Sequence, residues 1–207
     1  MTLTKITPSI IGANCYILIS ENQAVVIDPS ISDEQIAKIC ENAGAELTAV
    51  LLTHAHFDHM LGLDRLRARF PEVPIMIHAN DAELMPDGEK NAYTVFFNKQ
   101  RDFGKPDKLL VGGDVIKFGS DRLTVIHTPG HTKGSVCYRS GNVLFSGDTV
   151  MYDSYGRCDL YSGDVKRMNE SLNNLYSLAL KNPGIVIYPG HGDKNLLIDA
   201  LSEIFDR

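Results

Sequence analysis

The sequence has no long apolar run. No window of its 207 residues approaches the roughly 18 to 20 apolar residues that a membrane-spanning helix needs. The first ten residues, MTLTKITPSI, also lack the apolar segment of a secretory signal peptide. We therefore expect a cytoplasmic protein with no membrane partner.

Basic clusters and cysteine motifs are absent as well. The formal net charge is −6 and the Lys and Arg residues are scattered, which argues against a nucleic-acid partner. The four cysteines show no CxxC spacing and predict neither a zinc knuckle nor a disulfide framework. They are Cys15, Cys40, Cys137 and Cys158. We expect buried free thiols and a small-molecule partner.

The composition is that of an ordinary globular protein. Hydrophobic residues make up 43% of the chain, enough for one well-buried core, so residues 1–207 are expected to form a single domain. Strands are predicted near residues 15–20, 24–28, 48–53, 74–78, 115–118, 123–128, 136–139, 143–146 and 185–189. Helices are predicted near residues 32–44, 58–70 and 165–180, with a last one at the C-terminus. Two runs of strands, each closed by a helix, predict an α/β protein with a four-layer αββα sandwich.

Four side chains of metal-ligand type gather directly after the predicted strand 48–53. They are His54, His56, Asp58 and His59. This place is the carboxyl end of a strand, where active sites of α/β folds collect. His54 and His56 are two residues apart and point to the same side of extended backbone, whereas Asp58 and His59 open the next helix and approach from another direction. The segment therefore predicts ligands for two adjacent metal ions.

Three more candidate ligands follow later strands, each beside a glycine. They are His131 in TPGHT, Asp148 in SGDT and His191 in PGHG. Glycine leaves room for the backbone to approach a site closely. The adjacent glycines are Gly130, Gly147 and Gly190.

In order and rough spacing, these segments resemble the metallo-β-lactamase superfamily, and within it the glyoxalase II (hydroxyacylglutathione hydrolase)-like branch. The resemblance runs from near Asn14 to His191 and itself implies the αββα sandwich. Little chain follows His191, whereas full-length glyoxalase II enzymes add a helical domain that helps to hold glutathione, so we expect a short form. The resemblance implies one metal held by His54, His56 and His131, a second held by Asp58, His59 and His191, and Asp148 as the bridge between them.

The activity implied is hydrolysis of a thioester, either S-lactoylglutathione or another. Two divalent metal ions, zinc or else iron or manganese, would hold a bridging hydroxide that attacks the carbonyl carbon. Asp58 would orient the hydroxide while remaining a ligand, and no serine or cysteine nucleophile would be needed.

Other functions remain open. Persulfide dioxygenases keep similar motifs but use a single iron held by residues matching His54, His131 and Asp148, so such an oxidoreductase is the main alternative. The third hypothesis is a metal-binding module without catalytic activity, which would predict missing ligands, and none is missing. The commonest zinc β-lactamases carry a cysteine where Asp148 stands, and RNA-processing relatives need a basic arm that this chain lacks.

Residues outside the ligand set carry weaker signals. Arg157 is a candidate for binding a substrate carboxylate, with an ion pair to Asp159 or Asp153 as the alternative. For His78 and His127 we expect structural roles, with support of a metal ligand as the alternative.

The segment 85–108 has an irregular pattern, because glycines and prolines divide it into loops and short helix. We expect it to form a lid or a wall of the substrate site.

Overall fold

The strands form two six-stranded sheets, one from each half of the chain. The computed structural model describes residues 1–8 and 11–206. In the first sheet the strands lie in sequence order, with β1 to β3 antiparallel and β3 to β6 parallel. They are β1 (Thr2–Ile6), β2 (Cys15–Ser20), β3 (Gln23–Ile27), β4 (Glu46–Leu51), β5 (Ile75–His78) and β6 (Lys108–Leu110).

Helices connect the parallel strands of this sheet, as parallel strands require a crossover. The helix α1 (Asp33–Asn42) leads from β3 to β4, and α2 (Leu63–Arg69) leads from β4 to β5. The Ser32 hydroxyl caps α1 by accepting a hydrogen bond from the backbone N–H of Gln35. A short helix, α3 (Tyr93–Phe97), lies between β5 and β6.

The second sheet has the order β12-β11-β10-β9-β8-β7 and contains one parallel pair, β10 with β11. Its strands are β7 (Val115–Phe118), β8 (Asp121–His127), β9 (Val136–Ser140), β10 (Val143–Gly147), β11 (Val186–Pro189) and β12 (Asn195–Leu196). The helix α4 (Val165–Lys181) makes the crossover of the parallel pair, and α5 (Leu197–Phe205) ends the fold. The Asp164 carboxylate caps α4 by accepting from the N–H of Arg167.

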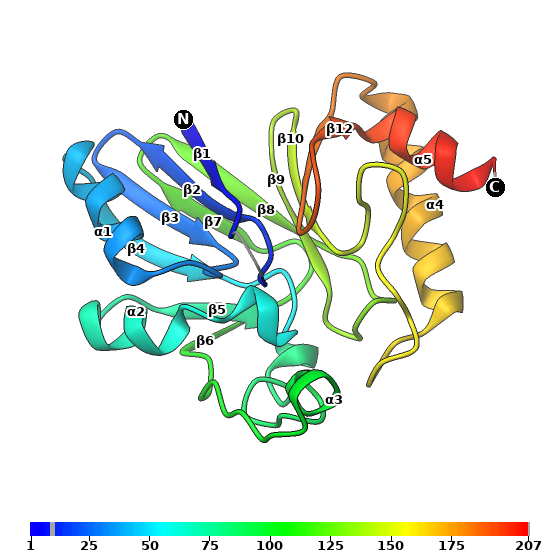
Figure 1. The fold of residues 1–207 in the computed structure, drawn as a ribbon. Helices are drawn as coiled ribbons and strands as arrows, with labels where there is room; N and C mark the ends of the chain where they lie inside the picture. Colours follow the sequence, from blue (N-terminus) through cyan, green and yellow to red (C-terminus); the bar gives the residue numbers. More distant parts are fainter. Residues whose placement is uncertain (9–10, 207) are drawn as a thin grey trace.

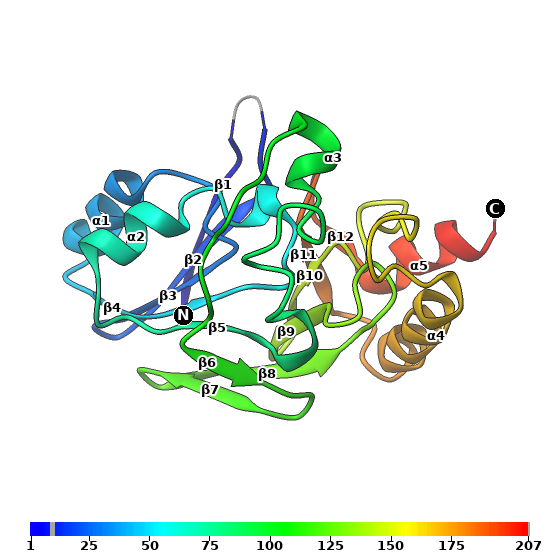
Figure 2. The ribbon, with the colours of Figure 1, turned by 90° about the horizontal axis from the view of Figure 1, so that it is seen from below.

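Three apolar clusters hold the four layers together. One lies between the sheets and joins residues such as Leu18 and Leu51 to Val125 and Phe145. The second packs α1 and α2 on the outer face of the first sheet, and the third packs α4 and α5 on the second sheet. Figures 1 and 2 show the two pairs of helices on opposite outer faces, with both sheets between them. The predicted αββα sandwich is therefore confirmed.

The predicted helix over residues 58–70 is wrong in its first half. A 3₁₀ turn over Phe57–His59 is followed by a break, and α2 begins only at Leu63. The break occurs where Gly62 donates its N–H to the carbonyl of Pro29 and packs so closely that a Cβ would overlap the carbonyl oxygens of Pro29 and Ile31. Tertiary contact, rather than helical periodicity, thus sets the path of the backbone here.

Within residues 1–8 and 11–206, no helix combines the length and the apolar character needed to cross a bilayer.

Candidate metal centre

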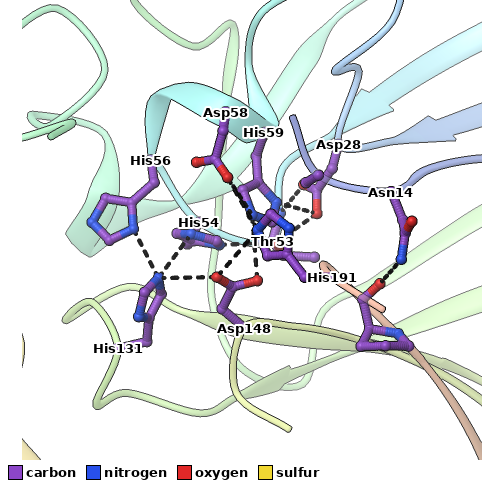
Figure 3. Close-up of polar contacts among 12 residues, drawn as sticks. Asn14, Asp28, Thr53, His54, His56, Asp58, His59, His131, Asp148 and His191 are labelled. Atoms are coloured by element: carbon purple, nitrogen blue, oxygen red, sulfur yellow. Dashed lines mark hydrogen bonds and ion pairs between the residues drawn. The ribbon is translucent and has the colours of Figure 1, made fainter. Parts of the chain in front are cut away.

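The loops after four strands meet at one edge of the sandwich. His54 to His59 follow β4, while His131, Asp148 and His191 follow β8, β10 and β11. Figure 3 shows the imidazole rings and carboxylates of these loops pointing toward one another. All seven predicted ligands therefore come together, although they are spread over most of the chain.

One group of nitrogen atoms is formed by three histidines. The Nε2 atom of His131 lies 2.8 Å from Nδ1 of His56 and 3.1 Å from Nε2 of His54. The three rings meet edge to face, with centroids 4.5 to 4.8 Å apart. Their ligand atoms all lie within 4.8 Å of one another, a spacing that suits a shared metal ion.

A second group contains Asp58, His59 and His191, whose ligand atoms also lie within 4.8 Å of one another. The Nε2 atom of His191 lies 3.0 Å from Oδ2 of Asp58, and Nε2 of His59 lies 3.9 Å from the same oxygen. These residues occupy the opposite side of the cluster from His56.

Asp148 lies between the two groups. Its Oδ2 atom lies 3.5 Å from Nε2 of His131 and 3.7 Å from Nε2 of His191, while its Oδ1 atom lies 3.4 Å from Nε2 of His59. Asp148 therefore lies within 3.7 Å of nitrogen atoms from both groups.

Neighbouring groups fix the tautomers of the histidine rings. The Nδ1–H of His131 donates to the carbonyl oxygen of Arg157 at 2.7 Å, which leaves a lone pair on Nε2. The hydroxyl of Thr53 donates to Asp28 and is therefore an acceptor for Nδ1 of His54, 3.1 Å away. Both rings thus present Nε2 to the cluster as an unprotonated ligand atom.

Burial and charge set the protonation of the cluster. Burial lowers the pKa of His54 well below its usual range, and burial together with the His131 charge lowers the pKa of His56 to about 3. Burial also disfavours the charged form of His59, but the charges of Asp28, Asp58 and Asp148 outweigh it and raise the His59 pKa well above normal. The acidic side of the cluster therefore stabilises a cation, whether a proton or a metal ion.

The donor atoms fit divalent metal ions. Within the described part of the chain, two buried polar atoms that face each other in the cluster have no hydrogen-bond partner: His59 Nε2 and Asp148 Oδ1. A buried polar atom without a partner is costly, and a cation would satisfy lone pairs of this kind. Five imidazoles and two carboxylates without a thiolate suit zinc, iron or manganese.

Asp28 supports the cluster and was not predicted as a functional residue. It directly follows β3 in the left-handed conformation (φ 51°) and is fully buried. Its carboxylate accepts hydrogen bonds from the N–H of Thr53 at 2.8 Å, the Thr53 hydroxyl at 2.7 Å and His59 Nδ1 at 2.9 Å. The available signal was its position at the carboxyl end of a strand beside β4, the same edge as the histidine motif.

Asn14 supports the loop of His191. Its side-chain amide donates to the carbonyls of Pro189 at 2.9 Å and Gly192 at 3.0 Å, so it holds both sides of that loop. In the sequence, Asn14 marked only the start of the family resemblance.

Asp81 joins two ligand-bearing loops and was also missed. This fully buried carboxylate accepts from the N–H of Ala55 at 3.1 Å, the hydroxyl of Thr132 at 2.7 Å and the N–H of Gly134 at 2.7 Å. Burial raises its pKa, against the effect of these hydrogen bonds. Asp81 therefore ties the segment of His54 and His56 to the loop of His131.

The variant Asp81→Asn should weaken metal binding by about tenfold or more, as losses of groups that orient metal ligands do. An amide keeps the size of the carboxylate but cannot accept all three hydrogen bonds, so one donor loses its partner. Competition titration against a chelator measures the affinity. Asp102→Asn, which alters an exposed carboxylate in contact with the N–H of Gly104, is the matched control. Equal affinities in the two variants would contradict the role of Asp81.

The structure places the remaining predicted residues as follows. Arg157 lines the cavity beside the cluster, and its guanidinium pairs with Asp159 through Nε–Oδ1 (2.6 Å) and Nη2–Oδ2 (2.7 Å) contacts. His78 and His127 stack on each other, with ring centroids 4.0 Å apart. In the described part of the chain, their side chains form hydrogen bonds with Asn80 and Lys133 rather than with the cluster, as expected for structural histidines.

The chain is similar to many known proteins. The sequence model described as "Metallo-beta-lactamase superfamily" matches residues 10–191. The Bacillus subtilis (strain 168) protein described as "Probable metallo-hydrolase YqgX" is 31% identical over 195 residues, covering 93% of this chain and 90% of the relative.

Two solved structures are similar over nearly the whole chain. The structure of BLEG-1 B3 metallo-beta-lactamase has a TM-score of 0.83 and 31% sequence identity, covering 95% of this chain and 94% of its own. The structure of TTHA1623 in a di-iron-bound form has a TM-score of 0.81 and 30% sequence identity, covering 95% of this chain and 96% of its own.

Proposed function

The chain belongs to the metallo-beta-lactamase superfamily, and from this we propose that it is a two-metal hydrolase that cleaves thioesters, as glyoxalase II-like enzymes do. The observation that carries the proposal is the meeting of all seven imidazole and carboxylate groups in one cluster, in two groups linked by Asp148. A di-iron form of a similar protein supports the proposal of two metal ions.

The residues that would hold the first metal ion are His54, His56 and His131, and those for the second are Asp58, His59 and His191, with Asp148 shared. Bound there, divalent metal ions would polarise a carbonyl oxygen and lower the pKa of water towards about 7. Among the described residues that line the cavity there is no serine, cysteine or lysine, so water is the proposed nucleophile.

Asp58 is the proposed catalytic residue. It lines the cavity, and 19% of its side chain remains accessible, so its carboxylate can orient a water molecule and accept a proton from it. Its Oδ2 atom lies 3.0 Å from Nε2 of His191, so the two side chains converge on one point. As the water oxygen bonds to the carbonyl carbon, the carbon–sulfur bond breaks, and the proton held at Asp58 passes to the departing thiolate.

The test is metal content per chain in protein purified without added metal, together with an assay on S-lactoylglutathione and on thioesters of N-acetylcysteamine. About two ions of zinc, iron or manganese with thioester turnover would support the proposal. A β-lactam belongs in the same assay, because one similar structure is a metallo-beta-lactamase. A single iron, oxygen uptake with a persulfide and no thioester turnover would overturn the proposal in favour of a persulfide dioxygenase.

A further inference from the structure

The cavity beside the cluster is lined partly by polar and partly by apolar side chains. It measures about 490 Å³, within the range of small-molecule sites. His56, Asp58, His131, Asp148 and His191 form the polar part of the lining. Apolar side chains complete the lining: Phe57, Phe96 and Phe97, whose rings are in contact through Phe57 and form a first wall, together with Met151 and Leu160.

The first wall is attached directly to the metal-ligand segment. Phe57 stands between His56 and Asp58 and contacts the rings of Phe96 and Phe97, with centroids 5.4 and 5.5 Å away. The backbone N–H of Phe57 also donates to the carbonyl of Asn91, just before α3, at 3.0 Å. The position of α3 relative to the cluster is therefore fixed by contacts that both share.

The ends of α3 are held in an unusual backbone conformation. Ala92 (φ 67°) and Asn98 (φ 50°) both lie in the left-handed region, which residues other than glycine rarely adopt. The buried Asn91 amide donates to the carbonyls of Met85 and Arg101 and joins the two ends of the surrounding loop. Such constraint is typical of functional segments and makes α3 a defined wall.

This wall leaves aromatic surface accessible. Phe96 is 55% exposed and Phe97 is 38% exposed, although both line the cavity. Exposed apolar surface next to a polar site is typical of ligand binding, because covering it removes apolar area from water.

The lining offers little to a charged substrate. Among its described residues, Arg157 is the one charged side chain outside the cluster, and the Nε and Nη2 atoms of its guanidinium already contact Asp159. A carboxylate on the substrate, such as those of glutathione, would have to compete with Asp159 for it. The walls therefore favour an apolar group.

We propose that the substrate carries an apolar group, an alkyl chain of about six to eight carbons or an aryl ring, next to the scissile bond, where it packs on Phe96 and Phe97. This inference rests on the proposed hydrolase function for its chemistry, but the apolar wall is an independent observation. The same wall disfavours glutathione as the leaving thiol.

The test compares chain lengths on both sides of the bond. One series runs from acetyl to octanoyl thioesters of N-acetylcysteamine, and the other from ethyl to octyl thioesters of acetate. Each fully buried methylene is expected to contribute about fourfold. In at least one series, kcat/KM should therefore rise by about tenfold or more with chain length and should exceed the value for S-lactoylglutathione.

The variant Phe96→Ala should remove most of this gain, lowering kcat/KM about five- to tenfold for the long substrate and less than about twofold for the short one. Val95→Ala is the matched control, because Val95 is 63% exposed on the same helix and is not among the residues lining the cavity. Equal effects of the two variants would overturn the inference, as would kcat/KM values that do not depend on chain length.

A binding measurement separates the two proposals. The thioether S-octyl-N-acetylcysteamine has no bond to hydrolyse, and calorimetry should show that Phe96→Ala weakens its binding about five- to tenfold, with Val95→Ala unchanged. If no acyl substrate is turned over but this pattern holds, the hydrolase proposal fails and the apolar site stands. If S-lactoylglutathione is preferred by tenfold or more, the apolar site fails and the hydrolase proposal stands.

Discussion

The variant His131→Ala should lose at least about a thousandfold of hydrolytic activity. A metal ion that polarises a carbonyl contributes several kcal/mol to catalysis, and each tenfold in rate corresponds to about 1.4 kcal/mol. His131 is central to one group of ligand atoms, with its Nε2 atom 2.8 Å from His56, 3.1 Å from His54 and 3.5 Å from Asp148. Its removal should therefore disrupt binding of the metal ion assigned to those histidines.

Metal content shows whether the loss of activity in His131→Ala comes from the loss of a metal ion. Elemental analysis should find about one ion fewer per chain in His131→Ala than in the unaltered protein, with an unchanged far-UV circular dichroism spectrum. A loss of activity with full metal content would show that His131 acts in another way.

The control is His127→Ala, four residues earlier in the chain. His127 stacks on His78 and contacts the carbonyl of Lys133, away from the seven cluster residues. We expect this variant to keep its metal and to change activity by less than about threefold, as substitutions remote from a site usually do. If both variants lost metal equally, the cluster would not be the site of binding.

The contrast between these two histidines also shows what the sequence could predict. Imidazoles at the ends of predicted strands, beside glycines and within a dense local motif, carry a strong signal, and the structure brings every one of them to the cluster. His127 lies one residue before the end of its predicted strand, 123–128. In the structure it is the last residue of β8, and its ring stacks on that of His78. The motif, rather than the residue type, distinguished them.

The supporting carboxylates could not be predicted in the same way. Asp28 and Asp81 are single aspartates after strands, and nothing local separates them from ordinary strand ends. Their roles depend on hydrogen bonds to Thr53, Thr132 and Gly134, which are distant in sequence. Such partners are known only once the loops have been placed in space.

Edge strands were also difficult to predict from the sequence. Buried strands with continuous apolar patterns, such as β4 and β10, were predicted to within about two residues, whereas β1, β6 and β12 were missed. The missed strands are all edge strands, and β6 and β12 contain only three and two residues. Their pairing depends on a neighbouring strand rather than on their own pattern.

Residues 85–108 were expected to form a lid or a wall of the substrate site, and Ala92, Phe96 and Phe97 of this segment line the cavity. The sequence carried no sign that Phe96 and Phe97 would face the cluster, because α3 has only five residues and its direction is set by Ala92, Asn98 and the contact with Phe57. The chemistry of the site was thus more accessible from sequence than the shape of its walls.

The variant Gly190→Ala should lower activity by about a hundredfold while the fold is retained. Gly190 has no positive φ that would forbid alanine, so the effect comes from space alone. A Cβ at this position would overlap Oδ1 of Asp148 and lie 2.6 Å from Cε1 of His59. Two proposed ligands from different loops would have to move, and a misplacement of about 1 Å in an active site can cost that much.

Gly184→Ala is the matched control at the other end of β11. Its Cβ would meet only the side-chain amide of Asn142, at 3.4 Å, which is ordinary contact. Metal affinity, measured by chelator competition, should fall in Gly190→Ala and stay unchanged in Gly184→Ala, with both proteins unfolding cooperatively. If Gly190→Ala bound metal normally and kept its activity, Asp148 and His59 would not need the positions that this structure gives them, and the assignment of Asp148 as the shared ligand would lose its support.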